Sequence, residues 1–356
     1  MSAPAAAKGE RGRRRRSHGQ TEPPWAGAWR AQLPKADTND WCRLIRGPPP
    51  VLARERSVAI NAVARASRVC QAVAARLTST DVVTKSDESP AVVNTILQAE
   101  FPEDRIVGEE DARDLRGDNQ RAEDLRSRVH ELANSALDGR RTAEQVSHVF
   151  RRFAGAAKGR QWTLDPIDGT KGFLRGGQYA VCLALIIDGQ VELGVMGCPN
   201  LPVDPSNPDG ERGCMFVTVR GQGAYQEIAI CMSPVSKVSE AVFCESVEAG
   251  HSSHDDAAEI ACALGITRAP VRMDSQCKYG TIARGAADIY LRLPVRKDYE
   301  ENIWVRVCVF YPSSPLHSSA VGPNRAYCHV FSPAVSHLQD HAAGALLVHE
   351  AGGIVS

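Results

Sequence analysis

Two aspartates, Asp165 and Asp168, stand in the segment 162–175, whose sequence is WTLDPIDGTKGFLR. A proline follows the first aspartate, a glycine follows the second, and the hydroxyl of Thr170 comes next. The two carboxylates and the Ile167 carbonyl between them are hard oxygen ligands, which magnesium prefers. This pattern therefore indicates metal-assisted phosphate chemistry.

Two further acidic clusters are candidates for the same site. One is the Glu-Glu-Asp segment 109–111, which follows a predicted strand, and the other is Asp340, at a predicted helix start. Hydrolysis of a phosphate ester needs an in-line water, neutralised phosphoryl oxygens and a stabilised leaving oxygen. Glu109 and the Thr170 hydroxyl are suited to orient and deprotonate that water. The N–H groups of Gly169 and Thr170 are suited to donate to phosphoryl oxygens.

Each cluster also has a plain structural interpretation. Segment 109–111 has the composition of a solvated loop, and Asp-Pro and Asp-Gly are common turn dipeptides. Asp340 alone fits a helix cap. Only the three clusters together favour a metal site.

The composition of the 356 residues excludes several classes of protein. The hydrophobic fraction of 43% suits a globular chain, and the zero net charge favours neither nucleic acid nor an anionic membrane as a partner. The eleven cysteines are scattered without a C-x-x-C pair, which predicts buried or half-buried thiols rather than a zinc ribbon or a disulfide framework. We expect a cytoplasmic, monomeric protein that acts on a small molecule.

Three regions follow from the pattern along the chain. Residues 1–50, Ala-rich and Pro-rich with a run of four arginines at 13–16, predict a disordered basic tail. That run leaves a nuclear or mitochondrial destination open as an alternative. We expect an N-terminal α+β metal-binding domain over 51–228 and a C-terminal α/β domain over 229–356.

Apolar periodicity predicts helices and strands that alternate, which is typical of a layered α/β fold. A type I′ turn at Asp188-Gly189 should join two strands of a hairpin. We expect helices within 58–77, 92–100, 125–136, 255–264, 276–285 and 341–350, and strands at 105–107, 179–187, 190–197, 215–219, 223–226, 271–273 and 289–293.

The motifs together resemble those of the lithium-sensitive inositol monophosphatase superfamily. They are GEE at 108–110, DPIDGT at 165–170, DHAAG at 340–344 and EAGG at 350–353. The segment KGFLR at 171–175, with 245–254, 274–279 and 290–294, is similar to the 3′(2′),5′-bisphosphate nucleotidase branch. The resemblance covers most of 55–304 and 340–356.

The resemblance implies an αβαβα sandwich that uses two or three magnesium ions to hydrolyse 3′-phosphoadenosine 5′-phosphate to AMP and phosphate. It also implies action on 3′-phosphoadenylyl sulfate, a place in sulfur assimilation, and inhibition by lithium. Thr170 would assist the nucleophilic water. The implied metal ligands are Glu109, Asp165, Ile167, Asp168 and Asp340; the implied nucleotide contacts are Glu248, His251, Ser275, Lys278 and Arg292.

Three departures from the family pattern leave alternatives open. A short stretch with a family aspartate is missing after Pro90, and the segment 305–339 intervenes before Asp340. That segment is interpreted as a translated intron, with a lineage-specific loop as the alternative. The chain is also expected to be truncated at its C-terminus. An inositol phosphate phosphatase and a non-catalytic family member are therefore the alternatives to a nucleotidase.

Overall fold

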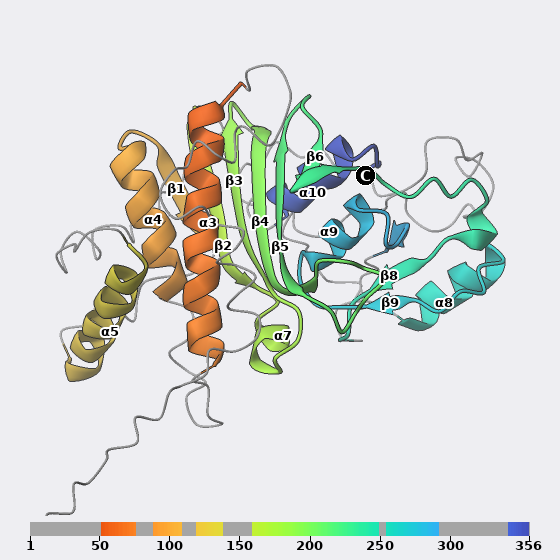
Figure 1. Ribbon diagram of the computed structural model, residues 1–356, viewed down its shortest axis with the longest axis horizontal. Helices are drawn as coiled ribbons and strands as arrows, with labels where there is room; N and C mark the ends of the chain where they lie inside the picture. Colours follow the sequence, from red (N-terminus) through yellow and green to blue (C-terminus); the bar gives the residue numbers. More distant parts are fainter. Residues whose placement is uncertain are drawn as a thin grey trace, which may run out of the picture.

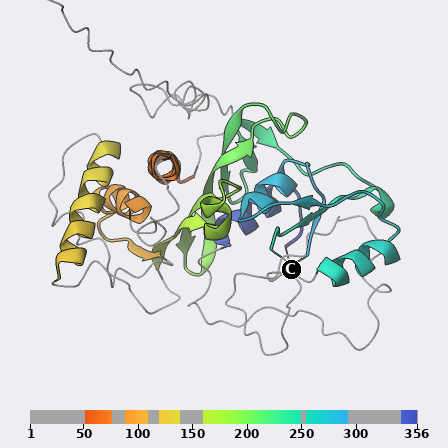
Figure 2. The ribbon, with the colours of Figure 1, turned by 90° about the horizontal axis from the view of Figure 1, so that it is seen from below.

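The structure is a computed structural model that describes residues 51–75, 88–108, 119–137, 159–248, 254–291 and 341–355. Five layers lie side by side in the two views of the ribbon (Figures 1 and 2). Helices α3 and α4 cover one face of a large sheet, with α5 packed against them on the outside, and α9 and α10 cover the other face. A small sheet follows, and α8 lies beyond it. This arrangement confirms the expected αβαβα sandwich.

The three N-terminal helices are α3 (Ala53–Ala74), α4 (Glu88–Glu100) and α5 (Gln120–Ala136). Buried apolar residues of α3 recur every three or four positions, as in Ala59, Val63, Ala66 and Val69, so one stripe faces the core. Helix α4 begins earlier than predicted. Pro90 lies in its first turn, where a proline removes no intrahelical hydrogen bond.

Within the described residues, seven strands form a sheet in chain order. The edge strand β1 pairs with β2 in parallel, and every later pair is antiparallel. The strands are β1 (Arg105–Gly108), β2 (Arg160–Asp168), β3 (Ala180–Ile187), β4 (Gln190–Pro202), β5 (Arg212–Val219), β6 (Ala224–Gln226) and β7 (Ile228–Ile230).

Both faces of this sheet are buried, and its residues alternate between them. In β3, Val181 and Leu183 belong to the core under α3, whereas Cys182 and Ala184 belong to the core under α9 and α10. The predicted Asp188-Gly189 turn is confirmed, since both residues have the positive φ angles that type I′ requires.

A second sheet contains three parallel strands in the order β10-β8-β9. Strand β8 is too short for an apolar period to predict it, and the sequence pattern also failed to predict β2 and β7. The remaining elements are β8 (Phe243–Glu245), β9 (Val271–Arg272), β10 (Ile289–Tyr290), the short 3-10 turn η1 (Val238–Glu240), and helices α7 (Thr170–Leu174), α8 (His254–Ala263), α9 (Cys277–Ala283) and α10 (Ala342–Glu350).

The start of α10 corrects one interpretation. The cap position is occupied by His341, which makes no capping hydrogen bond through its side chain, so Asp340 is not the cap residue. Asp340 itself lies outside the described residues, as do segments 1–50 and 305–339. The domain boundary at residue 228 stays a prediction.

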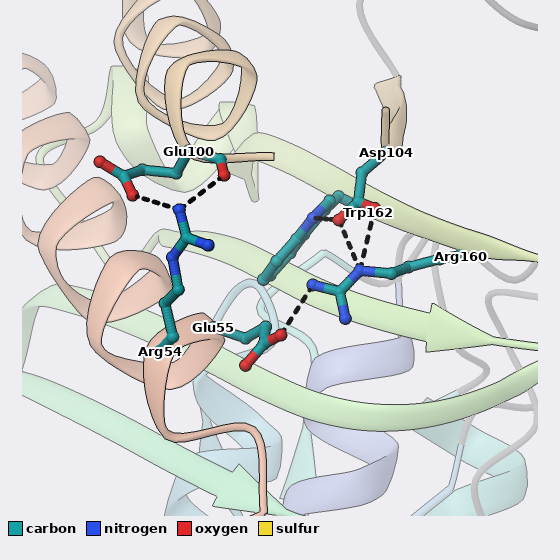
Figure 3. A network of polar contacts seen from close by, with 6 residues as sticks. All are labelled: Arg54, Glu55, Glu100, Asp104, Arg160 and Trp162. Atoms are coloured by element: carbon teal, nitrogen blue, oxygen red, sulfur yellow. Dashed lines mark hydrogen bonds and ion pairs between the residues drawn. The ribbon is translucent and has the colours of Figure 1, made fainter. Parts of the chain in front are cut away.

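A polar network fixes the beginning of β2 (Figure 3). The Arg160 Nε donates to both oxygens of Asp104, at 2.9 and 2.7 Å, and its Nη2 donates to Glu55 at 3.0 Å. The indole N–H of the fully buried Trp162 donates to Asp104 at 2.8 Å. One carboxylate therefore positions two residues of the strand that ends at Asp168.

A neighbouring contact joins α3 to α4. Arg54 Nη2 donates to the carbonyl and to the carboxylate of Glu100, both at 3.0 Å (Figure 3). The guanidinium groups of Arg54 and Arg160 each lie 5.1 Å from the centre of the Phe101 ring. These cation–π contacts tie both helices to the start of β2.

We expect the substitution Asp104→Ala to lower the free energy of unfolding by about 2–3 kcal/mol, because it leaves the buried Trp162 N–H and the Arg160 Nε without their acceptor. Urea unfolding followed by circular dichroism measures the change. The control is Glu240→Ala, which removes an ion pair with Lys237 that is mostly exposed and worth under ~0.5 kcal/mol. Equal losses in the two variants would contradict this account of the network.

The described cysteines are mostly buried, as the sequence predicts. Burial raises the pKa of Cys214 to about 12 and that of Cys244 to about 12. The pKa values of Cys182 and Cys198 also lie well above the ordinary thiol value, chiefly because of burial. Only Cys231 and Cys262 are exposed among the described residues. In the same ranges, no helix combines the length and the apolar character needed to cross a membrane.

Iodoacetamide at pH 8 should therefore modify Cys231 and Cys262 and leave Cys182, Cys198 and Cys244 unmodified in the folded protein, because the thiolate is the reactive form. Peptide mass spectrometry reads out each site. The same reaction in urea is the control, and all five should then react. Rapid labelling of Cys198 in the native protein would show that the reagent reaches the core between the large sheet and helices α9 and α10.

Candidate functional site

The segment of highest chemical interest forms a bulge in β2. Asp165 pairs with Cys182 of β3, but Asp168 pairs with Ala180, so β2 contains one extra residue between the two aspartates. Pro166, which has no N–H to offer a neighbouring strand, lies in this bulge. A bulge of this kind bends the strand locally, and Asp168 beyond it still pairs with β3.

The side chain of Asp165 stabilises the bulge. Its Oδ1 accepts a hydrogen bond from the Ile167 N–H at 3.1 Å, and the residue is only 2% exposed. The Thr170 hydroxyl donates to the Ile167 carbonyl at 3.3 Å. Two carboxylates, one carbonyl and one hydroxyl are thus gathered at the end of one strand. This does not fit the alternative of an ordinary solvated turn.

The bulge carries negative charge. The pKa of the Cys182 thiol, opposite Asp165 on β3, is raised first by burial and then by the charges of Asp168 and Asp165. The two carboxylates therefore act on the same neighbour. Within the described ranges, no three Asp, Glu, His or Cys side chains gather to hold a metal ion. The bulge contributes the two carboxylates of Asp165 and Asp168. Two further predicted metal ligands, Glu109 and Asp340, lie outside those ranges.

Gly169 brings this loop into direct contact with the second half of the chain. It has a φ of +84°, and a Cβ built on it would lie 2.7 Å from the Cβ of Ser275. Ser275 itself has a φ of 67°, which is uncommon for a residue with a side chain. A glycine is required here both by the backbone conformation and by the close approach.

Gln276 links three segments that are distant in sequence. Its backbone N–H donates to Asp168 Oδ2, and its side-chain Oε1 accepts from the N–H of Gly344 at 3.1 Å. The residue is fully buried. Nearby, the Tyr279 hydroxyl and His341 Nδ1 are 3.0 Å apart. The beginning of α10 is therefore held beside the β2 bulge.

The carboxyl ends of strands in the second sheet lie on the side of the β2 bulge. Strand β8 runs into residues 246–248, and β9 runs into residues 273–276. Because β8 and β9 are parallel, these two segments leave the same edge of the sheet. In open sheets of parallel strands this edge is where ligands bind. The bulge of β2 faces that edge through the Gly169–Ser275 contact.

The sequence profile of the Inositol monophosphatase family matches residues 51–304. The chain belongs to this family. A relative in Emericella nidulans, named 3′(2′),5′-bisphosphate nucleotidase, is 40% identical over 85% of this chain and 87% of its own length. A relative of the same name in Schizosaccharomyces pombe is 39% identical over 85% of this chain and 84% of its own length.

A solved structure has the same fold. The extragenic suppressor protein suhB of Bartonella henselae aligns with a TM-score of 0.51 and 16% identity. The alignment covers 84% of this chain and 85% of that protein. At this level of identity the likeness concerns the architecture alone, and it confirms the predicted fold class.

The structure brings together part of the residue set that the family resemblance implies. Ser275 touches the loop at Gly169, and Glu248 is bonded to Lys171 and Arg175, just beyond that loop. The described members next to the β2 bulge are Asp165, Ile167, Asp168, Gly169, Thr170 and Ser275. Glu109, His251, Arg292 and Asp340 lie outside the described residues, so their roles stay predictions.

Lys278, another of the implied nucleotide contacts, is buried. It is only 6% exposed, its Nζ donates to the Met273 carbonyl at 3.4 Å, and it lies 5.2 Å from the centre of the Tyr290 ring. Its charge is thus held beneath the edge where β9 and β10 end. This arrangement suits a cation reserved for an anionic ligand.

Sequence reasoning missed Gln276, Asp274 and Arg175 as parts of the site. Gln276 looks like an ordinary polar position near a helix start, and its two partners are 108 and 68 residues away. No local pattern reveals such contacts. The sequence offers two weaker signals, the clustering of polar residues at 274–276 before an apolar helix and the similarity of segments 171–175 and 274–279 to the nucleotidase branch.

Gly169→Ala should destabilise the protein more than Gly176→Ala. Both glycines have positive φ angles, and an alanine there costs about 1–2 kcal/mol; only Gly169 adds a clash, because nothing lies within 4 Å of a Cβ on Gly176. We expect a further loss of about 1–3 kcal/mol in the Gly169 variant. Thermal unfolding of the two variants measures this difference, and equal melting temperatures would show that residues 169 and 275 are not in contact.

Proposed function

We propose that the protein is a magnesium-dependent phosphatase that hydrolyses the 3′-phosphate of 3′-phosphoadenosine 5′-phosphate to give AMP and phosphate. The observation that carries the proposal is the contact between the oxygen-rich end of β2 and the segment that follows β9, whose parallel neighbour β8 ends at the same edge. Such a junction offers a phosphate site on one side and a nucleotide site on the other. The name that the two fungal relatives share supports the same substrate.

The residues at the bulge fit magnesium. Asp165, Asp168 and the Ile167 carbonyl are hard oxygen ligands, and a carboxylate buried as deeply as Asp165 is stabilised by a cation. Family members are generally metal-dependent. We propose that Glu109 and Asp340 complete a site for two or three ions. When bound, magnesium neutralises phosphoryl oxygens and lowers the pKa of a bound water.

The chain's own groups orient the attack. Because Thr170 Oγ1 donates its proton to the Ile167 carbonyl, the oxygen lone pairs are directed to accept a hydrogen bond from the attacking water. Glu109 is proposed to take the proton of that water. The N–H groups of Gly169 and Thr170, at the start of α7, are proposed to donate to phosphoryl oxygens.

The nucleotide is proposed to lie over the edge of the second sheet. The proposed contacts all follow strands of this parallel sheet. Ser275 and Lys278 follow β9, Glu248 and His251 follow β8, and Arg292 follows β10. Lys278 is held by one long hydrogen bond to a carbonyl, which a 5′-phosphate oxygen can replace with a stronger, charge-assisted bond. We propose that 3′-phosphoadenylyl sulfate is a second substrate of the same site and that the activity belongs to sulfur assimilation.

Purified protein should release phosphate from 3′-phosphoadenosine 5′-phosphate only when magnesium is present. We expect Asp168→Asn to lower kcat by at least about 100-fold, because it removes a charged oxygen from the proposed metal site. A colorimetric phosphate assay, with inositol 1-phosphate as the competing substrate, makes the measurement. Asp209→Asn, at an exposed position of the β4–β5 connection, is the matched control and should retain full activity.

The outcomes separate the alternatives. Turnover that persists in EDTA contradicts the metal mechanism, and faster turnover of inositol 1-phosphate contradicts the nucleotide assignment. A folded protein that is stabilised by AMP and magnesium in a thermal shift, but releases no phosphate, is a non-catalytic family member.

A further inference from the structure

Two cations at the end of α7 face carboxylates from the second half of the chain. Arg175 donates through Nη1 to Glu248 Oε1 and through Nη2 to Asp274 Oδ2, the latter at 2.6 Å. Lys171 Nζ lies 3.5 Å from the other oxygen of Glu248. The side chain of Arg175 is 43% exposed, whereas that of Asp274 is only 10% exposed. A single guanidinium therefore joins two carboxylates that are 26 residues apart in sequence.

The backbone around α7 is shaped to accept Asp274. A Cβ on Gly172 would lie 2.8 Å from both the Cβ and Oδ2 of Asp274, and 2.1 Å from the Gln178 carbonyl. A Cβ on Gly177 would lie 3.9 Å from the same Asp274 oxygen. A side chain at Gly172 would push Asp274 away from α7, whereas the distance from Gly177 is an ordinary van der Waals contact. The short distance between Asp274 and Arg175 therefore depends on a glycine in this loop.

Each residue of the segment 274–276 contacts the segment 168–175. Asp274 bonds Arg175, Ser275 packs on Gly169, and the Gln276 N–H bonds Asp168. Glu248, the last described residue of the segment after β8, has its hydrogen bonds to Arg175 and Lys171. Arg175 is therefore the residue through which the ends of both β8 and β9 are tied to α7.

The charges of this bridge persist at neutral pH. The hydrogen bond from Arg175, with the nearby charge of Lys171, holds the pKa of Glu248 below its usual range. The two carboxylates in turn raise the pKa of Arg175. A lysine at position 175 would keep the positive charge but lose the planar fork that reaches two carboxylates at once.

We propose that Arg175 is a positioning residue that sets the distance between the two nucleotide-binding segments, and thereby the affinity for the nucleotide part of the substrate. This inference rests on the proposed function, since Glu248 and Ser275 are the proposed nucleotide contacts. Arg175 holds the segment of Glu248 through one nitrogen and the residue before Ser275 through the other. Its loss separates the two halves of the nucleotide site and leaves the β2 bulge in place.

The test compares wild-type protein with Arg175→Gln and Arg175→Lys in magnesium buffer. We expect Arg175→Gln to raise the KM for 3′-phosphoadenosine 5′-phosphate about tenfold and to lower kcat by less than about threefold. The dissociation constant for AMP, measured by isothermal titration calorimetry, should rise by about the same tenfold factor. Arg175→Lys should give an intermediate KM, because it restores the charge without the fork.

The matched control is Arg220→Gln. Arg220 is 38% exposed and lies 3.5 Å from Glu192, so it is another half-exposed arginine with a carboxylate partner, at the far end of β5. Its replacement should leave KM and AMP affinity within about twofold of wild type, as is usual for a surface ion pair.

The outcomes distinguish the inference from the function it rests on. If wild-type protein neither hydrolyses the nucleotide nor binds AMP, the proposed function is wrong and the inference falls with it. If the wild type does both and Arg175→Gln keeps the wild-type KM and AMP affinity, the inference alone is overturned. It is equally overturned if the loss is confined to kcat, or if Arg175→Lys behaves as wild type. Should Arg175→Gln fail to fold by circular dichroism, the Arg175→Lys result decides.

Discussion

The fold of the functional region depends on the hydrogen bonds of one buried residue, Gln276. Its N–H bonds Asp168 at the end of β2, and its side chain accepts from Gly344 in α10. Since a buried amide that loses its partners costs about 1–3 kcal/mol, the three segments are stable only together. The β2 bulge, the start of α9 and the start of α10 therefore form one unit, although 176 residues separate the first from the last.

Small residues make this unit compact. Gly169 lies on Ser275, and a Cβ on Gly344 would lie 2.7 Å from the ring of Tyr279. Gly194 of β4 has no side chain, which lets the backbone of Ala343 lie close to it. A Cβ on Gly194 would be 2.9 Å from the Ala343 Cα. Helix α10 can therefore lie directly on the sheet and beside α9, as the ribbon shows (Figure 1). At the opposite end of β2, the Asp104 network holds the strand that carries the bulge.

Much of the fold could be predicted from local pattern. The strands β3 and β4 are rich in apolar residues and are joined by an Asp-Gly turn, and α3 has a clear apolar stripe. Strand β8 is only three residues long, so it contains no period to detect, whereas the two-residue strand β10 lies within the strand predicted at 289–293. Their place is fixed by parallel pairing with each other, which is a contact between residues about 46 positions apart and has no signature in either segment.

The sequence by itself determined the chemistry, because the DPIDGT motif fixes which oxygens and which hydroxyl stand next to one another in the chain. Asp165, Ile167, Asp168 and Thr170 are neighbours in any conformation, and their types indicate metal and phosphate. Tertiary structure decided what lies opposite them. Gln276 bonds Asp168, Ser275 packs on Gly169, Lys278 is buried, and Arg175 spans two carboxylates. Such contacts depend on how two sheets pack across α9 and α10, and packing is a property of distant segments that no local pattern contains.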